Sequence, residues 1–277
     1  MAIAIIDEQH KFGVEQRLKL VSKTKGAHCL IMTATPIPRS LSLTQYGDLD
    51  ISTIKVMPKG RKGHKTRIVT PDNFSNFLNF INTRLSMNEQ VYIVVPAINE
   101  SETQDFLHLT QVLEKFKAIF PEYKVCGLHG QLKSEEKSRA FKDFKNHEID
   151  ILIATSVIEV GINVPNATIM AILNPERFGL SSLHQLRGRV GRGSKPGFCF
   201  LVNDKKVSLE SMNRLKVIEQ NNDGFSIAEH DLKIRGEGDI FGKNQSGSIT
   251  TKKLANIVIH QTHLNQHPYP HYRKVRL

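Results

Sequence analysis

The sequence predicts an α/β fold in which parallel sheets are flanked by helices, and three observations lead to this prediction. Short apolar runs without polar alternation are typical of parallel strands that are covered on both faces. Longer windows between them carry apolar residues at spacings of three and four, the pattern of a helix with one buried face. The two patterns alternate along most of the 277 residues, which is the order that right-handed β-α-β crossovers produce.

The apolar runs predict seven strands, and two of the windows between them predict clear helices. The predicted strands are Ile3–Ile6, Cys29–Met32, Val91–Val95, Lys124–Leu128, Ile151–Ala154, Thr168–Leu173 and Phe198–Val202. The window Thr103–Phe120 has one apolar stripe and predicts a helix. A second helix is expected over Ser134–Lys145, because Ser134 followed by Glu135 and Glu136 is typical of a capped, acidic helix start.

Two segments depart from the strand–helix rhythm. Lys55–Arg67 carries six Lys or Arg residues, two Gly and one Pro without any acidic residue, which predicts a linker between two α/β units. After Asn203 the apolar runs stop, and the pattern predicts helices on either side of a turn at Asn221–Gly224. The first helix is expected over Ser208–Gln220, and Ile227–Ile240 is expected to form two short helices broken at Gly236 and Gly238.

The composition narrows the class of protein. A hydrophobic fraction of 39% with 23% charged residues is that of a globular protein and excludes disorder throughout. No apolar run approaches the roughly 18 residues of a membrane helix, and the first ten residues do not resemble a secretory signal. Cys29, Cys126 and Cys199 lie too far apart for a disulfide framework or a zinc knuckle. The cysteine pattern and the first ten residues therefore predict a reducing, intracellular compartment. The net charge of +11 favours a polyanionic partner.

An acidic motif follows the first predicted strand. Asp7-Glu8-Gln9-His10 stands where parallel α/β sheets bind ligands, at the carboxyl end of a strand. A carboxylate there can hold Mg²⁺, and a neighbouring one can activate the water that attacks a γ-phosphate. For an isolated Asp–Glu pair, a solvated acidic turn is the plainer alternative.

Two further motifs make that alternative less probable. Thr33-Ala34-Thr35-Pro36 follows the next strand with hydroxyl groups that can relay hydrogen bonds. The segment from Gln185 to Arg192, QLRGRVGR, has three arginines and two glycines. Arg189 and Arg192 are three residues apart, which predicts one shared helical face suited to clamping the charge of a phosphoryl transfer. Taken alone, such a run could equally be a flexible nucleic-acid-binding segment.

Together these motifs resemble a known series. DEQH, TATP, the stretch Ala154–Ala167 and QLRGRVGR resemble motifs II, III, V and VI of superfamily-two helicases. Longer segments look like the RecG family, DNA translocases that remodel stalled forks and branched junctions; they are Asp7–Arg17, Met32–Asp50, Leu128–Lys137 and Asn174–Gly193. The related transcription–repair coupling translocase shares much of this, but its motif II reads DEEQ where this chain has DEQH, which favours RecG.

The resemblance implies a RecA-like P-loop NTPase helicase fold with a C-terminal helical hairpin, and it divides the chain into four parts. Residues 1–58 would be the closing portion of a first, ATP-binding RecA-like domain with motifs II and III. Residues 59–204 would be a second RecA-like domain with motifs IV to VI. Residues 205–247 would form the hairpin and loop of the translocation motif, and residues 248–277 a basic tail.

The resemblance also implies which residues handle the cofactors, ATP and Mg²⁺. Asp7 would hold Mg²⁺ through ATP and Glu8 would activate water. Gln9 and His10 would contact the nucleotide and couple hydrolysis to the second domain, where Gly161 and Asn163 would also face it. Gln185, Arg189 and Arg192 would reach the triphosphate, with Arg192 as the arginine finger. Asn163 stands where the family usually has Asp.

The DNA-facing residues are implied in the same way. Thr33 and Thr35 would transmit the coupling, and His129, Thr155 and Glu159 would approach the DNA backbone. Arg214, Arg235 and Gln245 fall on the functional positions of the translocation motif. The expected partners are double-stranded DNA, branched DNA and, as a further candidate, single-stranded DNA-binding protein. The expected state is a monomer in the bacterial cytoplasm, associated with the nucleoid and with no membrane.

One motif of the series has no counterpart. No G-x-x-x-x-G-K-[ST] phosphate loop occurs in the 277 residues. The chain is therefore expected to be the C-terminal part of a RecG, from a truncated or split reading frame, and to be inactive as an ATPase by itself. The alternative function is a non-catalytic DNA-binding or interaction module, or an inactive remnant of a helicase gene.

Overall fold

A computed structural model describes residues 3–7, 28–33, 52–54, 62–96, 102–130, 132–155, 164–203 and 207–240. For residues 102–106, 232 and 234–240 it describes the backbone alone. The chain divides into two compact units, Met1–Glu229 and His230–Leu277.

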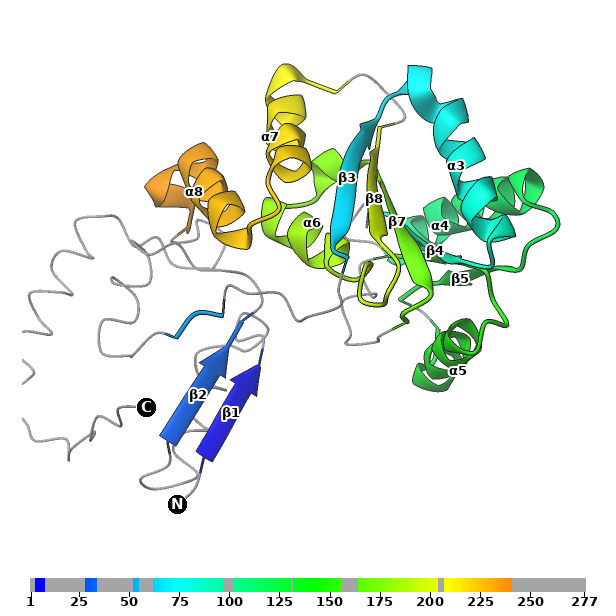
Figure 1. Cartoon of the computed structure of the whole chain (residues 1–277), viewed down its shortest axis with the longest axis horizontal. Helices are drawn as coiled ribbons and strands as arrows, with labels where there is room; N and C mark the ends of the chain where they lie inside the picture. Colours follow the sequence, from blue (N-terminus) through cyan, green and yellow to red (C-terminus); the bar gives the residue numbers. More distant parts are fainter. Residues whose placement is uncertain are drawn as a thin grey trace, which may run out of the picture. The chain divides into compact units, whose positions relative to one another are not determined.

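The first unit contains a six-stranded parallel sheet in the order β3-β8-β7-β4-β6-β5 (Figure 1). Its strands are β3 (His64–Val69), β4 (Gln90–Val94), β5 (Val125–Leu128), β6 (Ile151–Ala154), β7 (Ala167–Leu173) and β8 (Gly197–Val202). Two further strands, β1 (Ile3–Asp7) and β2 (His28–Met32), pair in parallel with each other. The predicted α/β class with parallel sheets is confirmed.

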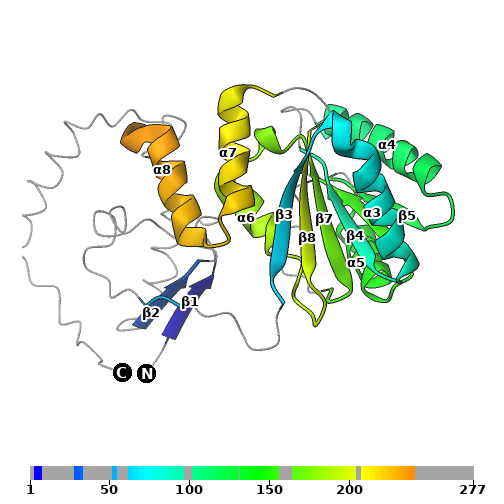
Figure 2. The same ribbon diagram turned by 45° about the horizontal axis from the view of Figure 1, so that its top comes forward.

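Helices cover both faces of the six-stranded sheet (Figure 2). On one face pack α3 (Phe74–Ser86) and α4 (Glu102–Ile119), and on the other α5 (Ser134–Lys145), α6 (Leu180–Arg187) and α7 (Leu209–Gln220). Side chains of a strand alternate between the two cores: Val91 and Ile93 of β4 belong to the core under α3 and α4, whereas Tyr92 and Val94 belong to the core under α5, α6 and α7. Each fully buried Val, Leu or Ile stabilises this arrangement by about 1.5–3 kcal/mol.

The helix starts are fixed by local hydrogen bonds. The Glu136 carboxylate accepts from the Lys133 backbone N–H at 2.8 Å, so α5 is capped one residue before the Ser134 that the sequence suggested. The Ser208 hydroxyl accepts from the Ser211 N–H at 3.2 Å and begins α7. The Asp223 carboxylate accepts from Ser226 N–H at 3.0 Å at the start of α8 (Gly224–Ile240).

Two predicted elements are wrong. The predicted linker Lys55–Arg67 contains the first four residues of β3, an edge strand that pairs with β8 alone. Lys65 and Arg67 of β3 point to solvent while Thr66 and Val69 are buried, and an edge strand tolerates such charges. The predicted break at Gly236 and Gly238 is absent, because α8 continues to Ile240. Glycine costs a helix about 1 kcal/mol but does not forbid it.

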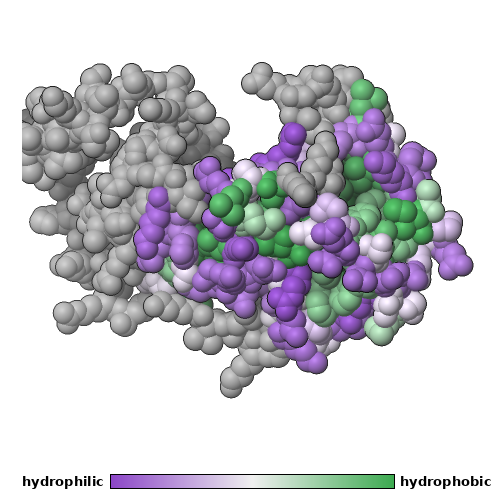
Figure 3. Space-filling view, turned by 90° about the horizontal axis from the view of Figure 1, so that it is seen from above, coloured by the Kyte–Doolittle hydropathy of each residue, from purple (hydrophilic) through white to green (hydrophobic). Residues whose placement is uncertain are grey.

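Exposed large apolar side chains of the described surface gather on the paired strands β1 and β2, where Ile3, Ile5, Leu30 and Met32 are 40–61% exposed. Figure 3 shows hydrophilic residues over much of the described surface of one face, with hydrophobic ones in groups between them. Met87, Leu107 and Ile119 are exposed, but they lie on different elements or on different turns of α4. No helix within the described residues is long and apolar enough to span a bilayer.

Candidate functional site

The carboxyl ends of β1 and β2 bring together two predicted site residues. Asp7 is opposite Met32 in the parallel register, so Thr33, the next residue, lies beside Asp7. Both residues are exposed. The carboxylate and hydroxyl oxygens are the donor type that Mg²⁺ prefers. The predicted residues Glu8, Gln9, His10 and Thr35 fall outside the described part of the chain.

Two other predicted residues meet at the carboxyl edge of the six-stranded sheet, where its strands end. His129 follows β5 and Thr155 follows β6, and the pair Leu128–Ala154 makes them neighbours. The Thr155 N–H donates to the Leu128 carbonyl at 3.4 Å. Burial and then the nearby Lys137 ammonium lower the pKa of His129. Glu159 falls outside the described residues.

The arginines of the QLRGRVGR motif lie at the opposite, amino edge of this sheet. Gln185 is in the last turn of α6, which ends at Arg187. Arg189 and Arg192 belong to the segment Gly188–Pro196, here called the arginine loop, which leads into the beginning of β8. The predicted shared helical face is therefore wrong: the two arginines are carried by a loop.

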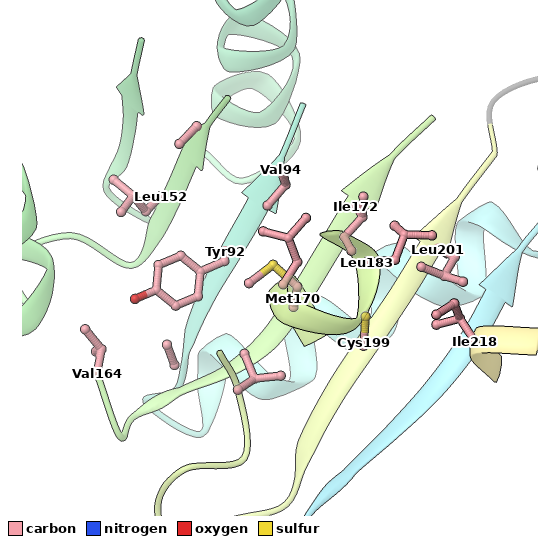
Figure 4. Packing of buried hydrophobic residues seen from close by; sticks show 14 of the residues in the cluster. Tyr92, Val94, Leu152, Val164, Met170, Ile172, Leu183, Cys199, Leu201 and Ile218 are labelled. Carbon is pink, nitrogen blue, oxygen red and sulfur yellow. The ribbon is translucent and has the colours of Figure 1, made fainter. Parts of the chain in front are cut away.

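The charges of both arginines nevertheless affect the same residue of the sheet, Tyr92. Burial raises the pKa of Tyr92 on β4 to about 12, and Arg189 and Arg192 both oppose that rise. The Tyr92 phenol points between Leu152 and Val164 (Figure 4).

Glycines determine the path of the arginine loop. Gly191 has φ +72°, and a Cβ added there would lie 2.4 Å from the Gly63 carbonyl oxygen. A Cβ on Gly193 would lie 2.9 Å from the carbonyl oxygen of Pro165, just before β7. The Arg192 Nε donates to the Gly188 carbonyl at 2.8 Å and closes the loop on itself. The loop thus packs directly on the backbone that precedes β3 and β7, where side chains would not fit.

The predicted residues of the second α/β unit are thus divided between two edges of one sheet. His129 and Thr155 lie at the carboxyl edge, and Gln185, Arg189 and Arg192 lie toward the amino edge. Gly161 and Asn163 fall outside the described residues, but Pro165, two residues after Asn163, adjoins the arginine loop.

The first arginine of the motif, Arg187, was not assigned a role from the sequence. Its side chain is 0% exposed, and NH1 donates to the carbonyls of Ile218 at 2.7 Å and Asn221 at 2.8 Å. A cation at these carbonyls interacts favourably with the C-terminal end of the α7 dipole. Position 187 continues the buried stripe of Leu180 and Leu183, and this periodicity was the available signal for its burial.

Two histidines next to Arg187 give a prediction for the pH dependence of stability. Burial, and then the Arg187 charge, lower the pKa of His64 and of His184 to about 4. The unfolded state, with a histidine pKa near 6.5, therefore binds more protons between pH 6.5 and 4. The free energy of unfolding should fall as pH falls through this window, by at most about 1.4 kcal/mol per pH unit for each histidine.

Urea unfolding between pH 7 and pH 5 measures this slope. His64→Gln with His184→Gln should flatten it, whereas His230→Gln, on the exposed side of α8, should leave it unchanged. Equal slopes for the double variant and the unmodified chain would contradict the assignment.

The three residues predicted for the translocation motif are placed unequally. Arg214 on α7 donates to the Glu176 carbonyl of the 3₁₀ turn η4 (Pro175–Arg177). Arg235 lies within α8, where the backbone alone is described, and Gln245 falls outside the described residues. No group of three or more metal-ligating side chains occurs among the residues that the structure describes.

Comparison with protein families gives two matches. Residues 72–194 match the helicase conserved C-terminal domain, which spans most of the six-stranded sheet and ends in the arginine loop. Residues 221–267 match the model of the ATP-dependent DNA helicase RecG, domain 3, C-terminal.

Similar proteins named ATP-dependent DNA helicase RecG occur in several bacteria. The Synechocystis protein is 48% identical over 251 residues, 89% of this chain and 30% of its own length. The Thermotoga maritima protein is 48% identical over 248 residues, which are 89% of this chain and 32% of the relative. The Bacillus subtilis protein is 46% identical over 259 residues, which are 93% of this chain and 38% of the relative. The chain thus spans about a third of the length of these curated relatives.

Two solved structures show the same architecture. A structure of RecG bound to a three-way DNA junction is 40% identical, covers 94% of this chain and 33% of its own, and has a TM-score of 0.71. The structure of Saccharomyces cerevisiae Dbp5 bound to RNA and ADP BeF₃ is 18% identical and has a TM-score of 0.54. The match covers 85% of this chain and 63% of Dbp5. The second likeness concerns the fold alone and confirms the predicted RecA-like helicase fold.

Proposed function

Because the chain belongs to the RecG family of ATP-dependent DNA helicases, we propose that it supplies the second motor half of a double-stranded DNA translocase. The substrates would be branched DNA, such as stalled forks and Holliday junctions, in recombination and repair. The observation that carries the proposal is the division of the site residues between two edges of one sheet. The amino edge, with the arginine loop, would face ATP, and the carboxyl edge would face the DNA backbone.

On the nucleotide side, the residues of this chain fit a triphosphate with Mg²⁺. Asp7 and Thr33 present oxygen atoms at adjacent strand ends, and Asp7 would hold the ion, with Glu8 activating water. Arg189 and Arg192 belong to the same loop after α6 and would stabilise the developing phosphate charge, Arg192 as the finger. Gln9, His10, Gln185, Gly161 and Asn163 would complete the contacts. ATP with Mg²⁺ would supply the free energy that closes the two halves.

On the DNA side, His129 and Thr155 would contact phosphates at the carboxyl edge, together with Glu159. Thr33 and Thr35 would relay the state of the nucleotide. Residues 205–247, with Arg214, Arg235 and Gln245, would be the hairpin that moves along duplex DNA. Residues 1–58 and 59–204 would be the two RecA-like portions, and residues 248–277 a basic tail.

The cellular setting is part of the same proposal. The protein would act as a monomer at the nucleoid in the bacterial cytoplasm, with single-stranded DNA-binding protein as a further partner. A branch-specific contact would come from parts of a RecG that this chain does not match.

The chain by itself should bind duplex DNA weakly and without sequence preference. Contacts to phosphates release counterions, so about two such contacts should lower affinity roughly tenfold between 50 and 200 mM salt. Fluorescence anisotropy with a labelled 30-base-pair duplex measures this. His129→Ala with Lys133→Ala should weaken binding about threefold or more, because both changes lie at the carboxyl edge.

The matched control is Lys115→Ala, an exposed lysine on α4. Affinity that does not change with salt, or equal loss in the control, would contradict a phosphate-binding edge. DNA-stimulated ATP hydrolysis by the chain alone should be negligible. Robust turnover that Glu8→Gln abolishes would refute that expectation.

A further inference from the structure

A buried carboxylate lies at the amino edge, close to the arginine loop. Glu89, in the turn between α3 and β4, is 3% exposed. Its Oε2 accepts from Arg84 Nε at 2.8 Å and lies 2.6 Å from Arg84 NH2. The Thr168 hydroxyl donates to the same oxygen. A buried charge is costly unless paired, and Arg84 provides that compensation.

The second oxygen of Glu89 faces the arginine loop. Lys195 Nζ lies 3.4 Å from Glu89 Oε1 and donates to Asn166 Oδ1 at 3.5 Å. The Asn166 side-chain amide in turn donates to the Asn88 carbonyl at 2.8 Å. Lys195 thus connects three segments that are distant in sequence: the arginine loop, the residue before β7 and the turn before β4.

The two halves of the loop are held by different means. Its first half is fixed by the backbone contact of Gly191 with Gly63 and by the bond from Arg192 to Gly188. In its second half, Gly193 packs closely on the Pro165 carbonyl, and Lys195 reaches the buried Glu89 through a side chain that is 44% exposed. Removing that side chain would leave no large cavity, and Glu89 would keep Arg84 as its counter-charge.

We propose that Lys195 is a positioning residue whose ion pair with Glu89 holds the arginine loop in the conformation that presents Arg189 and Arg192. The consequence for catalysis rests on the proposed function. The ion pair itself does not, and it can be measured in the chain alone.

Hydrogen–deuterium exchange of peptides covering 188–196 tests the ion pair at low salt. Lys195→Ala should speed exchange in this segment about threefold to fivefold, as expected for an ion pair with one exposed partner. The melting temperature should change little. Lys195→Arg should restore slow exchange, and 0.5 M salt should bring the unmodified chain toward the alanine variant.

The matched control is Lys117→Ala, which removes an exposed ion pair with Glu114 at 3.0 Å on α4. Its arginine loop should exchange as in the unmodified chain. Unchanged exchange in Lys195→Ala, or an equal rise across all peptides, would overturn the proposal.

A second readout tests the positioning role. In a chimera in which this chain replaces the matched part of Bacillus subtilis RecG, Lys195→Ala should lower kcat for ATP about threefold or more with little change in KM. Arginines that act in the transition state affect kcat in this way. Faster loop exchange with an unchanged kcat would overturn the positioning role. A chimera without any ATPase would instead refute the proposed function, and the exchange result would stand separately.

Discussion

Arg187→Leu is expected to lower the free energy of unfolding of the first unit by about 3 kcal/mol. Arg187 is fully buried and donates to the carbonyls of Ile218 and Asn221 at the end of α7, and to Asn222 at 3.4 Å. Leucine fills part of the volume but leaves these carbonyls without their charged donor. Hydrogen bonds to charged groups contribute about 1.5–3 kcal/mol each, so the loss should lie well above the mean of about 1 kcal/mol for a point substitution.

The measurement is thermal and urea unfolding followed by circular dichroism at pH 7. A loss of 3 kcal/mol corresponds to a fall of about 6–12 °C in melting temperature for a domain of this size. Arg187→Lys should be intermediate, because a lysine ammonium lacks the fork that reaches two carbonyls at once. Arg177→Leu, at an exposed position on η4, should stay within about 0.5 kcal/mol.

The same substitution has a second consequence through the neighbouring histidines. The Arg187 charge is one cause of the low pKa of His64 and His184, and its NH2 lies 2.9 Å from His184 Nδ1. Arg187→Leu should therefore also reduce the slope of stability between pH 5 and 7. If stability and slope were both unchanged, Arg187 would not be the residue that joins α6 to α7.

The sequence was sufficient to predict most of the sheet. Seven apolar runs correspond to strands, because a parallel strand covered on both faces needs continuous apolar residues. The edge strand β3 was missed because half of its side chains face solvent and carry charges, which makes HKTRIV resemble the basic segment before it. Helix α8 was predicted to break because single glycines weaken a helix but do not decide its end.

The roles of the site residues stay predictions, but part of their expected geometry was wrong. QLRGRVGR predicted a shared helical face for Arg189 and Arg192, whereas Gly188 and Gly191 belong to a loop. The placement at the amino edge could not be read from a rule that puts ligands at the carboxyl ends of strands. Glu89 and Lys195 had no sequence signal, because their pairing depends on segments over a hundred residues apart.

Our central proposal is that this chain would supply the nucleotide-facing arginines and the DNA-facing edge of a RecG-type motor. The chimera with Bacillus subtilis RecG is the direct test, since the two proteins are 46% identical over 259 residues. Arg192 belongs to the arginine loop, and an arginine that stabilises the transition state of phosphoryl transfer contributes about 10³–10⁵ in kcat.

The deciding measurement is steady-state ATP hydrolysis by this chimera with and without branched DNA. We expect DNA-dependent turnover, and we expect Arg192→Ala to lower kcat by about a thousandfold or more while the protein stays folded and binds DNA. Arg177→Ala should retain the activity of the unmodified chimera. A folded chimera without DNA-dependent turnover, or an Arg192→Ala variant within about threefold of the unmodified kcat, would contradict the claim.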